Sequence, residues 1–178
     1  MINVVDTPNP DTKKFVFETT IVAKGSKEFK KKDGSISLVD QLFSIEEIEL
    51  IFLDKNFISV RKSKDASWDS LVQKVLDLLN ESINENFKPF IFEEENEFTD
   101  EVSLRIEEVL NEKIRPAVAM DGGDIRLKSF KNGVAEVMLK GACAGCPSST
   151  ITLKHGVERM IKHYVPEVTS VEAININD

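Results

Sequence analysis

Apolar positions in the first half of the chain cluster as they do in β-strands. Residues 14–22 are rich in β-branched and aromatic side chains, which predicts a strand or a hairpin. Residues 48–62 contain two such runs around a polar segment at residues 54–56, which predicts a hairpin that turns there. Residues 24–35 carry glycines, serines and a run of lysines, and they predict a loop.

Helical spacing occurs at two places in this half. Residues 37–43 predict a short helix. Residues 68–84 predict a longer one, because apolar side chains recur there on one helical face and Ser67 can cap the first turn. Together with the strands, these helices predict a small α+β domain with helices packed on one face of a small mixed sheet.

The second half has a simpler pattern of helix, hairpin, helix and strand. Residues 102–118 and residues 147–163 carry apolar stripes at helical spacing. Between them, two β-rich runs flank Asn132 and Gly133, which form the strongest short hairpin signal. Residues 168–176 predict a final strand. The order α-β-β-α-β predicts a second small α+β domain, again with helices on one face of a mixed sheet.

An acidic stretch separates the two halves. Residues 89–99 begin with a proline and contain three consecutive glutamates, which indicates a solvated linker between a domain at residues 1–88 and a domain at residues 100–178. The stretch also holds apolar side chains that are unusual in a linker and that we expect to dock on a flanking domain. These are Phe90, Ile91, Phe92 and Phe98.

Charge and hydropathy limit the classes of function. The chain of 178 residues has a formal net charge of -8, whereas general nucleic-acid binders are usually basic, so we expect no nucleic-acid partner. No apolar run approaches the roughly 18 residues of a membrane span, and the N-terminus lacks the pattern of a secretory signal. We therefore expect no membrane association, and a protein of the bacterial cytoplasm or of an organelle matrix. We find no catalytic residues and expect no enzyme.

The only two cysteines, Cys143 and Cys146, form one Cys-x-x-Cys motif. The motif follows a predicted strand. Gly141 allows the chain to turn, and Gly145 allows the backbone to pass close to whatever the two sulfurs hold. Pro147 suits the first position of the following helix. Because the free N–H groups at a helix N-terminus stabilise thiolates and anionic clusters, the surroundings favour a reactive or metal-binding pair.

Four kinds of site fit such a pair. A disulfide across so short a step would restrain the chain little. A zinc site would need two further ligands, and His155 and His163 lack the spacing of a zinc finger, so we expect both on the surface of a helix. A thioredoxin-like dithiol oxidoreductase is the main alternative, since its motif also joins a strand to a helix, although no aromatic residue precedes Cys143 and the domain does not begin with a βαβ unit.

The fourth possibility is an iron–sulfur cluster. Such a cluster is held by four thiolates, and one chain supplies two. A second copy, related by a two-fold axis beside the cysteines, would supply the other two. A cluster shared in this way is exposed and suits transfer better than long-term electron transport, because separating the two copies releases it.

Several ordered motifs resemble the Nfu (NifU-like) family, and the resemblance covers nearly the whole chain. In the second half the motifs are Arg115-Pro116, residues 121–125 and the run at 141–149 that contains both cysteines. In the first half they are the Thr-Pro-Asn-Pro of residues 7–10, Leu42-Phe43, the hairpin segment at residues 57–60, and Trp68.

The resemblance implies an iron–sulfur scaffold or carrier. Family members bind a [4Fe-4S] cluster between two subunits through this motif and pass it to apo-proteins, so Cys143 and Cys146 are the expected ligands. The implied partners are a second copy of the chain, apo iron–sulfur client proteins and upstream assembly factors, and we expect the first domain to recognise the last two. The family's Asp-Gly-Gly-Asp signature at residues 121–124 is interpreted here as a turn that the glycines shape and the aspartates cap.

Overall fold

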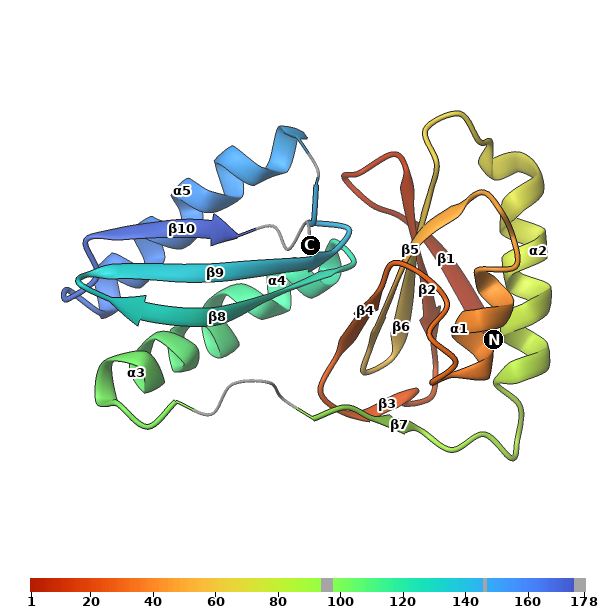
Figure 1. The fold of residues 1–178 in the computed structure, drawn as a ribbon, viewed down its shortest axis with the longest axis horizontal. Coiled ribbons are helices and arrows are strands. Elements are labelled where there is room, and N and C mark those ends of the chain that lie inside the picture. The colour runs from red at the N-terminus through yellow and green to blue at the C-terminus, as the bar shows by residue number, and fades with distance from the viewer. Residues whose placement is uncertain (94–97, 146, 175–178) are drawn as a thin grey trace. The chain divides into compact units, whose positions relative to one another are not determined.

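The computed structural model describes residues 1–93, 98–145 and 147–174, and it describes only the backbone of residues 147–150. The chain divides into two compact units, Met1–Glu94 and Glu95–Asp178. Each unit has its own hydrophobic core and combines helices with a sheet (Figure 1). The predicted α+β fold class is confirmed for both, whereas the mixed sheet expected in each unit is wrong for the main sheet of the N-terminal unit, which is antiparallel.

The N-terminal unit is built on a five-stranded sheet in which all neighbouring strands run antiparallel. The predicted hairpin at residues 48–62 is confirmed as the β5–β6 pair. The loop predicted at residues 24–35 is wrong in part, because three of its residues pair with β5. Across the sheet the strands are β1 (Ile2–Asp6), β2 (Thr12–Phe17), β6 (Phe57–Lys62), β5 (Ile48–Asp54) and β4 (Lys27–Phe29).

Two helices cover this sheet, α1 (Ser37–Leu42) and α2 (Trp68–Ser82), and both were predicted. The Ser67 hydroxyl caps α2 by accepting a hydrogen bond of 3.3 Å from the Asp69 N–H. Buried leucines and valines of both helices join the core that the sheet contributes to. Figure 1 shows the two helices together on one side of the sheet.

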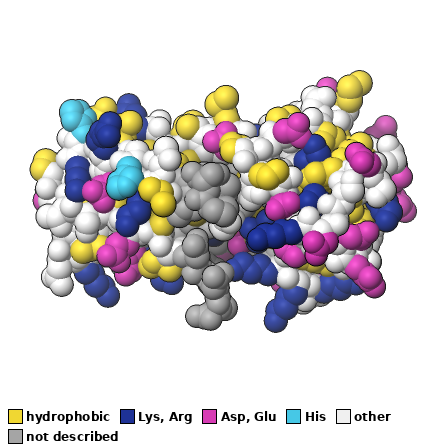
Figure 2. All heavy atoms as spheres, turned by 90° about the horizontal axis from the view of Figure 1, so that it is seen from above, with side chains coloured by type: hydrophobic (Ala, Val, Ile, Leu, Met, Phe, Trp, Pro, Cys, Tyr) yellow, Lys and Arg dark blue, Asp and Glu magenta, His cyan; other side chains and the backbone are white. Residues whose placement is uncertain are grey.

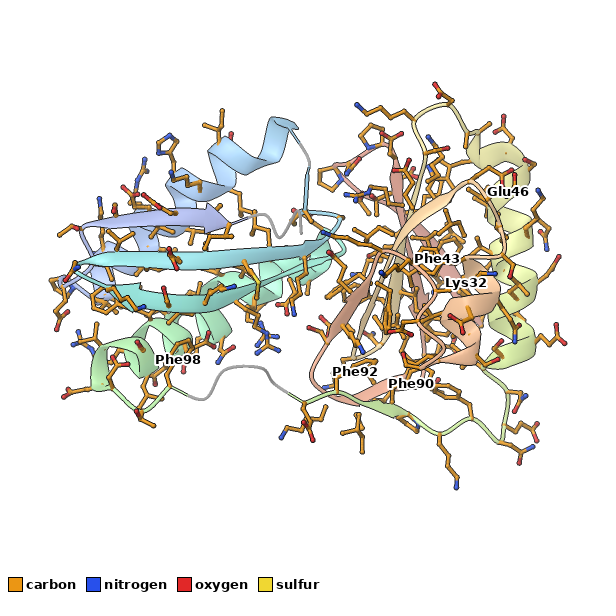
Figure 3. All side chains as sticks on the ribbon, in the orientation of Figure 1. Lys32, Phe43, Glu46, Phe90, Phe92 and Phe98 are labelled. Carbon is orange, nitrogen blue, oxygen red and sulfur yellow. The ribbon has the colours of Figure 1, made fainter. Side chains whose placement is uncertain are left out.

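The beginning of the predicted linker is a strand. β7 (Phe90–Ile91) pairs in parallel with β3 (Val22–Lys24) of the N-terminal unit. Phe92 also packs on the N-terminal core, whereas Phe98 packs on the core of the C-terminal unit, and Figure 3 shows Phe98 close to the helix that follows it. The expected docking is thus confirmed for the phenylalanines, while the side chain of Ile91 is 72% exposed.

The C-terminal unit has a mixed sheet of three strands in the order β10 (Ser170–Ile174), β9 (Val134–Gly141) and β8 (Gly123–Lys131). The predicted hairpin is β8–β9, and its turn residues Asn132 and Gly133 both adopt positive φ, at 51° and 80°. Within the described residues, β10 runs parallel to β9 and pairs with it from Val134 to Met138, and β8 pairs with β9 up to Gly141.

The helices of this unit are α3 (Glu101–Val109), the π-helical segment η1 (Leu110–Ile114), α4 (Arg115–Met120) and α5 (Pro147–Tyr164). Alternate residues of β9, Ala135, Val137 and Leu139, share one core with residues of all four segments. Because alternate residues of a strand point to the same face, the helices cover one face of the sheet, as predicted. In Figure 1, α3 and α4 lie alongside β8, and α5 lies alongside β10.

Candidate metal centre

Cys143 lies in a tight turn at the end of the central strand β9. The Ala144 N–H donates a hydrogen bond of 3.1 Å to the Gly141 carbonyl and closes the turn around the cysteine. Gly141 and Gly145 have φ values of 67° and 71°, a conformation that side chains disfavour. Cys143 is 6% exposed and belongs to the core of the C-terminal unit. Cys146 lies outside the described residues, and α5 begins directly after it.

The turn at residues 121–124 packs directly against this cysteine. The Ala142 N–H donates a hydrogen bond of 3.1 Å to the Gly122 carbonyl. A Cβ atom on Gly123 would lie 2.7 Å from the Cys143 Sγ and 2.8 Å from the Lys140 carbonyl oxygen. Gly122 adopts φ of 80°, so one glycine shapes the turn, as expected, while the other leaves room for the thiol.

Asp124 also makes side-chain contacts that the interpretation of a capped turn did not include. Its side chain is 3% exposed and binds two arginines. The Arg115 Nε and Nη2 donate to its two carboxylate oxygens at 2.7 and 3.3 Å, and the Arg126 Nε donates at 3.1 Å. A buried carboxylate is tolerable here because two guanidinium groups compensate its charge.

A π turn places Arg115 at this position. Pro116 has no N–H and would crowd the carbonyl four residues earlier, so a regular α-helix cannot continue through it. The helix widens instead, and the Arg115 N–H donates to the Leu110 carbonyl across a π turn. The Arg115 Nη1 also donates to the Asn111 Oδ1 at 2.6 Å. The helix predicted at residues 102–118, in which Pro116 was expected to cause a kink or to end the regular part, is therefore three segments.

The cysteine loop joins β9 to α5, and β9, α5 and the parallel strand β10 form a βαβ unit. Loops at the carboxyl ends of such strands commonly hold ligands, because the N–H groups at the start of the helix point into the same space. The domain begins with a helix and a hairpin, as predicted, but its later half contains the βαβ arrangement that the sequence did not reveal.

The described residues offer no other metal site. Among residues 1–93, 98–145 and 147–174 no three His, Cys, Asp or Glu side chains lie together as metal ligands would. His155 and His163 are exposed on α5, as expected, and Figure 2 shows the histidine side chains (cyan) at the surface. Within the same residues, no helix is both long and apolar enough to span a membrane.

The sequence analysis proposed Cys143 as a ligand but did not include the residues that pack around it. Gly123, Asp124, Arg115 and Arg126 form the structure beside Cys143. The available signal was an Asp-Gly-Gly-Asp turn between a helix and a strand, which is also typical of ordinary loops.

Comparison with known proteins extends over both units. A family model described as "Scaffold protein Nfu/NifU N terminal" matches residues 2–86, and the model "NifU-like domain" matches residues 106–172. In the crystal structure of protein SAV1430 from Staphylococcus aureus, the similar region covers 44% of this chain and 98% of that chain, with 27% identity and a TM-score of 0.41.

Two curated relatives carry the name "NFU1 iron-sulfur cluster scaffold homolog, mitochondrial". The protein of Drosophila persimilis is 34% identical over 97% of this chain and 64% of its own length. The human protein is 34% identical over 97% of this chain and 71% of its own length. The chain thus spans less than two thirds of the Drosophila protein. These matches show that the chain belongs to the Nfu (NifU-like) family.

Proposed function

We propose that this protein is an iron–sulfur cluster scaffold or carrier that binds a [4Fe-4S] cluster through Cys143 and Cys146 and delivers it to apo-proteins. The cluster is its cargo. The main support for this proposal is the position of Cys143. A turn with two positive-φ glycines holds this residue at the end of the central strand, beside the start of α5. The names of the curated relatives support the same role.

The number of ligands supports sharing of the cluster between two copies. The chain has two cysteines, while a cluster of this kind is held by four thiolates. Large apolar side chains are exposed on either side of the motif: Met120, at the end of α4, is 76% exposed, and Ile151, in α5, is 67% exposed. A second copy facing the cysteine loop would cover such side chains, so cluster binding and dimerisation would occur together.

The arrangement favours transfer over catalysis. A cluster held between two copies is released when the copies separate or when a client thiolate replaces one of its ligands. The receiving partners would be apo iron–sulfur proteins, with assembly factors upstream, and the N-terminal unit would recognise them. The names of the mitochondrial relatives make an organelle matrix as suitable a compartment as the bacterial cytoplasm.

One observation favours a dithiol oxidoreductase as the second candidate. The motif lies between β9 and α5 of a βαβ unit, which is the local setting of thioredoxin-like dithiols. In that case the two thiols would act without iron and would reduce a disulfide substrate.

Anaerobic reconstitution with ferrous iron and sulfide distinguishes the two functions. For the carrier we expect about four irons and four sulfides per two chains, measured chemically and by native mass spectrometry. Cys143→Ser and Cys146→Ser should each abolish both the iron and the dimer. Ser129→Ala, which removes a hydroxyl on β8 and its hydrogen bond to Glu136, is a control for the loss of a polar contact away from the cysteines and should load normally.

Other outcomes would contradict parts of the proposal. About two irons per two chains would indicate a [2Fe-2S] cluster, and a loaded single chain would exclude sharing. Reduction of a disulfide substrate by iron-free protein would favour the second candidate.

The role of the N-terminal unit is tested by deleting residues 1–94, which removes β7 together with its unit. Unchanged transfer to every client would contradict recognition by that unit.

A further inference from the structure

We infer, on the basis of the function proposed above, that Arg115 and Asp124 are positioning residues for Cys143. Their ion pair fixes the start of β8 to the helices, and it thereby keeps Gly123 packed against the cysteine that would bind the cluster. Neither residue needs to touch the cluster for this role.

The pair connects two layers of the domain around the edge of the sheet. β8 is an edge strand of the three-stranded sheet. Ile125 lies in the core under the helices, so Asp124, its neighbour in the strand, points to the other face. Arg115 comes from the helical layer and donates two hydrogen bonds, of 2.7 and 3.3 Å, to the Asp124 carboxylate. A planar guanidinium that binds both oxygens restricts orientation as well as distance.

The helical end of the pair is itself held in place. Arg115 begins α4 directly after the π turn, and its remaining Nη1 donates to Asn111 within that turn at 2.6 Å. The strand end is supported by Arg126, which lies on the same face as Asp124 and donates to it at 3.1 Å. Both partners of the pair are thus anchored in regular structure.

The connection to the cysteine is direct. Gly123 precedes Asp124 in the chain, and the position of its absent Cβ lies 2.7 Å from the Cys143 Sγ. Any shift of Asp124 along or around β8 would move Gly123 and open or close this contact. Groups that orient a metal ligand without binding the metal commonly change metal affinity about 10- to 100-fold when they are altered.

The test compares variants of Arg115 with a variant of a second, more exposed arginine–carboxylate pair at the far end of the same domain. Arg115→Gln removes the charge, and Arg115→Lys keeps the charge but lacks the planar fork. The control is Arg105→Gln, which removes hydrogen bonds of 2.7 Å to Glu167 and 3.2 Å to the Tyr164 carbonyl. Tyr164 ends the 18-residue helix α5, which starts at the cysteine loop, so the control pair lies roughly 25 Å away along that helix.

Three properties are measured on the full chain: the melting temperature of the apo-protein, the half-life of the cluster absorbance in excess chelator, and the visible circular dichroism of the loaded protein. We expect Arg115→Gln to shorten the half-life about 10- to 100-fold and to change the dichroism, because the ligand geometry changes. Arg115→Lys should shift both in the same direction by a smaller amount. Arg105→Gln should leave both unchanged and should lower the melting temperature less, because this ion pair is more exposed.

The outcomes separate this inference from the proposed function. If the wild-type protein takes up no iron, the proposed function fails. If it loads, and the Arg115 variants keep wild-type half-lives and dichroism, only the positioning role fails. Equal loss of retention in Arg105→Gln would also overturn it, since general stability would then explain the effect. If Arg115→Gln does not fold, Arg115→Lys decides, because it leaves Asp124 with a charged partner.

Discussion

The contact between Gly123 and Cys143 makes Gly123→Ala a sharp test of the site. The added methyl group would lie 2.7 Å from the Cys143 Sγ, 2.8 Å from the Lys140 carbonyl oxygen and 3.1 Å from the Cys143 Cβ. Ordinary contacts between non-bonded atoms are about 3.5–4.0 Å. The Lys140 carbonyl belongs to the paired strand β9, so the cysteine side chain is the group that can move.

Two opposing effects determine the change in stability. Replacing glycine by alanine stabilises a compatible site by about 0.4–1 kcal/mol, because the unfolded chain loses freedom. Inserting a methyl group into a packed site costs about 1–3 kcal/mol. The steric term is larger, so we expect the free energy of unfolding of the C-terminal unit to fall by about 1–2 kcal/mol. Iron retention should fall as well, because Cys143 is displaced.

Gly156→Ala is the matched control, since a Cβ on Gly156 would meet no atom within 4 Å. Gly156 lies inside α5, where alanine is favoured over glycine by about 0.8–1 kcal/mol, so this variant should be more stable and should load normally. The single tyrosine lies in the C-terminal unit and the single tryptophan in the N-terminal unit, so the two unfolding transitions can be followed separately in urea.

In both Gly123→Ala and Gly156→Ala, we expect the urea transition that the tryptophan reports to stay unchanged. Wild-type stability and wild-type iron retention in Gly123→Ala would refute the reasoning, because they would mean that the thiol does not pack on this glycine. Loss of stability with unchanged iron retention would contradict only the expected displacement of the Cys143 ligand, and the packing of the thiol on Gly123 would stand.

Three further predictions concern the two units. Phe92→Ala should destabilise the N-terminal unit by about 1–3 kcal/mol, less than the loss of a fully buried phenylalanine would. Ile91→Ala should leave the stability unchanged, because this side chain is 72% exposed. Equal urea midpoints for the two variants would contradict this. Ser67→Ala should cost the same unit about 1 kcal/mol through the lost cap, and an unchanged tryptophan transition would show that the cap is dispensable. A hydrogen bond from Lys162 lowers the pKa of Glu158. The carboxylate therefore stabilises the fold above the pKa of an unfolded glutamate, and this stabilisation is lost as the pH falls through the lower folded pKa. The melting temperature should vary less with acidic pH for Glu158→Gln than for the wild type, and an equal dependence on pH would exclude the effect.

Features that depend on neighbouring residues could be read from the sequence. The hairpin at Asn132 and Gly133 was predictable because both positions need positive φ, which these two residue types accept. The α2 helix was predictable because its apolar face and its cap are both local. The order of elements in the C-terminal unit followed from these signals.

Features that depend on distant partners could not be read in this way. The short strands β1, β4 and β7 are defined by their pairing rather than by their own pattern, so no local period identifies them. Asp124 looks like a turn residue, because nothing local indicates that Arg115 reaches it after a π turn. The parallel pairing of β10 likewise depends on the crossover through α5.

The central position of β9 has a consequence for hydrogen exchange. From Val134 to Met138 the strand is bonded to β10 on one side and to β8 on the other. Opening this segment therefore requires both neighbouring strands to separate, and its amide hydrogens should be among the slowest to exchange in the C-terminal unit. Their exchange rate would then report the global unfolding of that unit, independently of any aromatic signal.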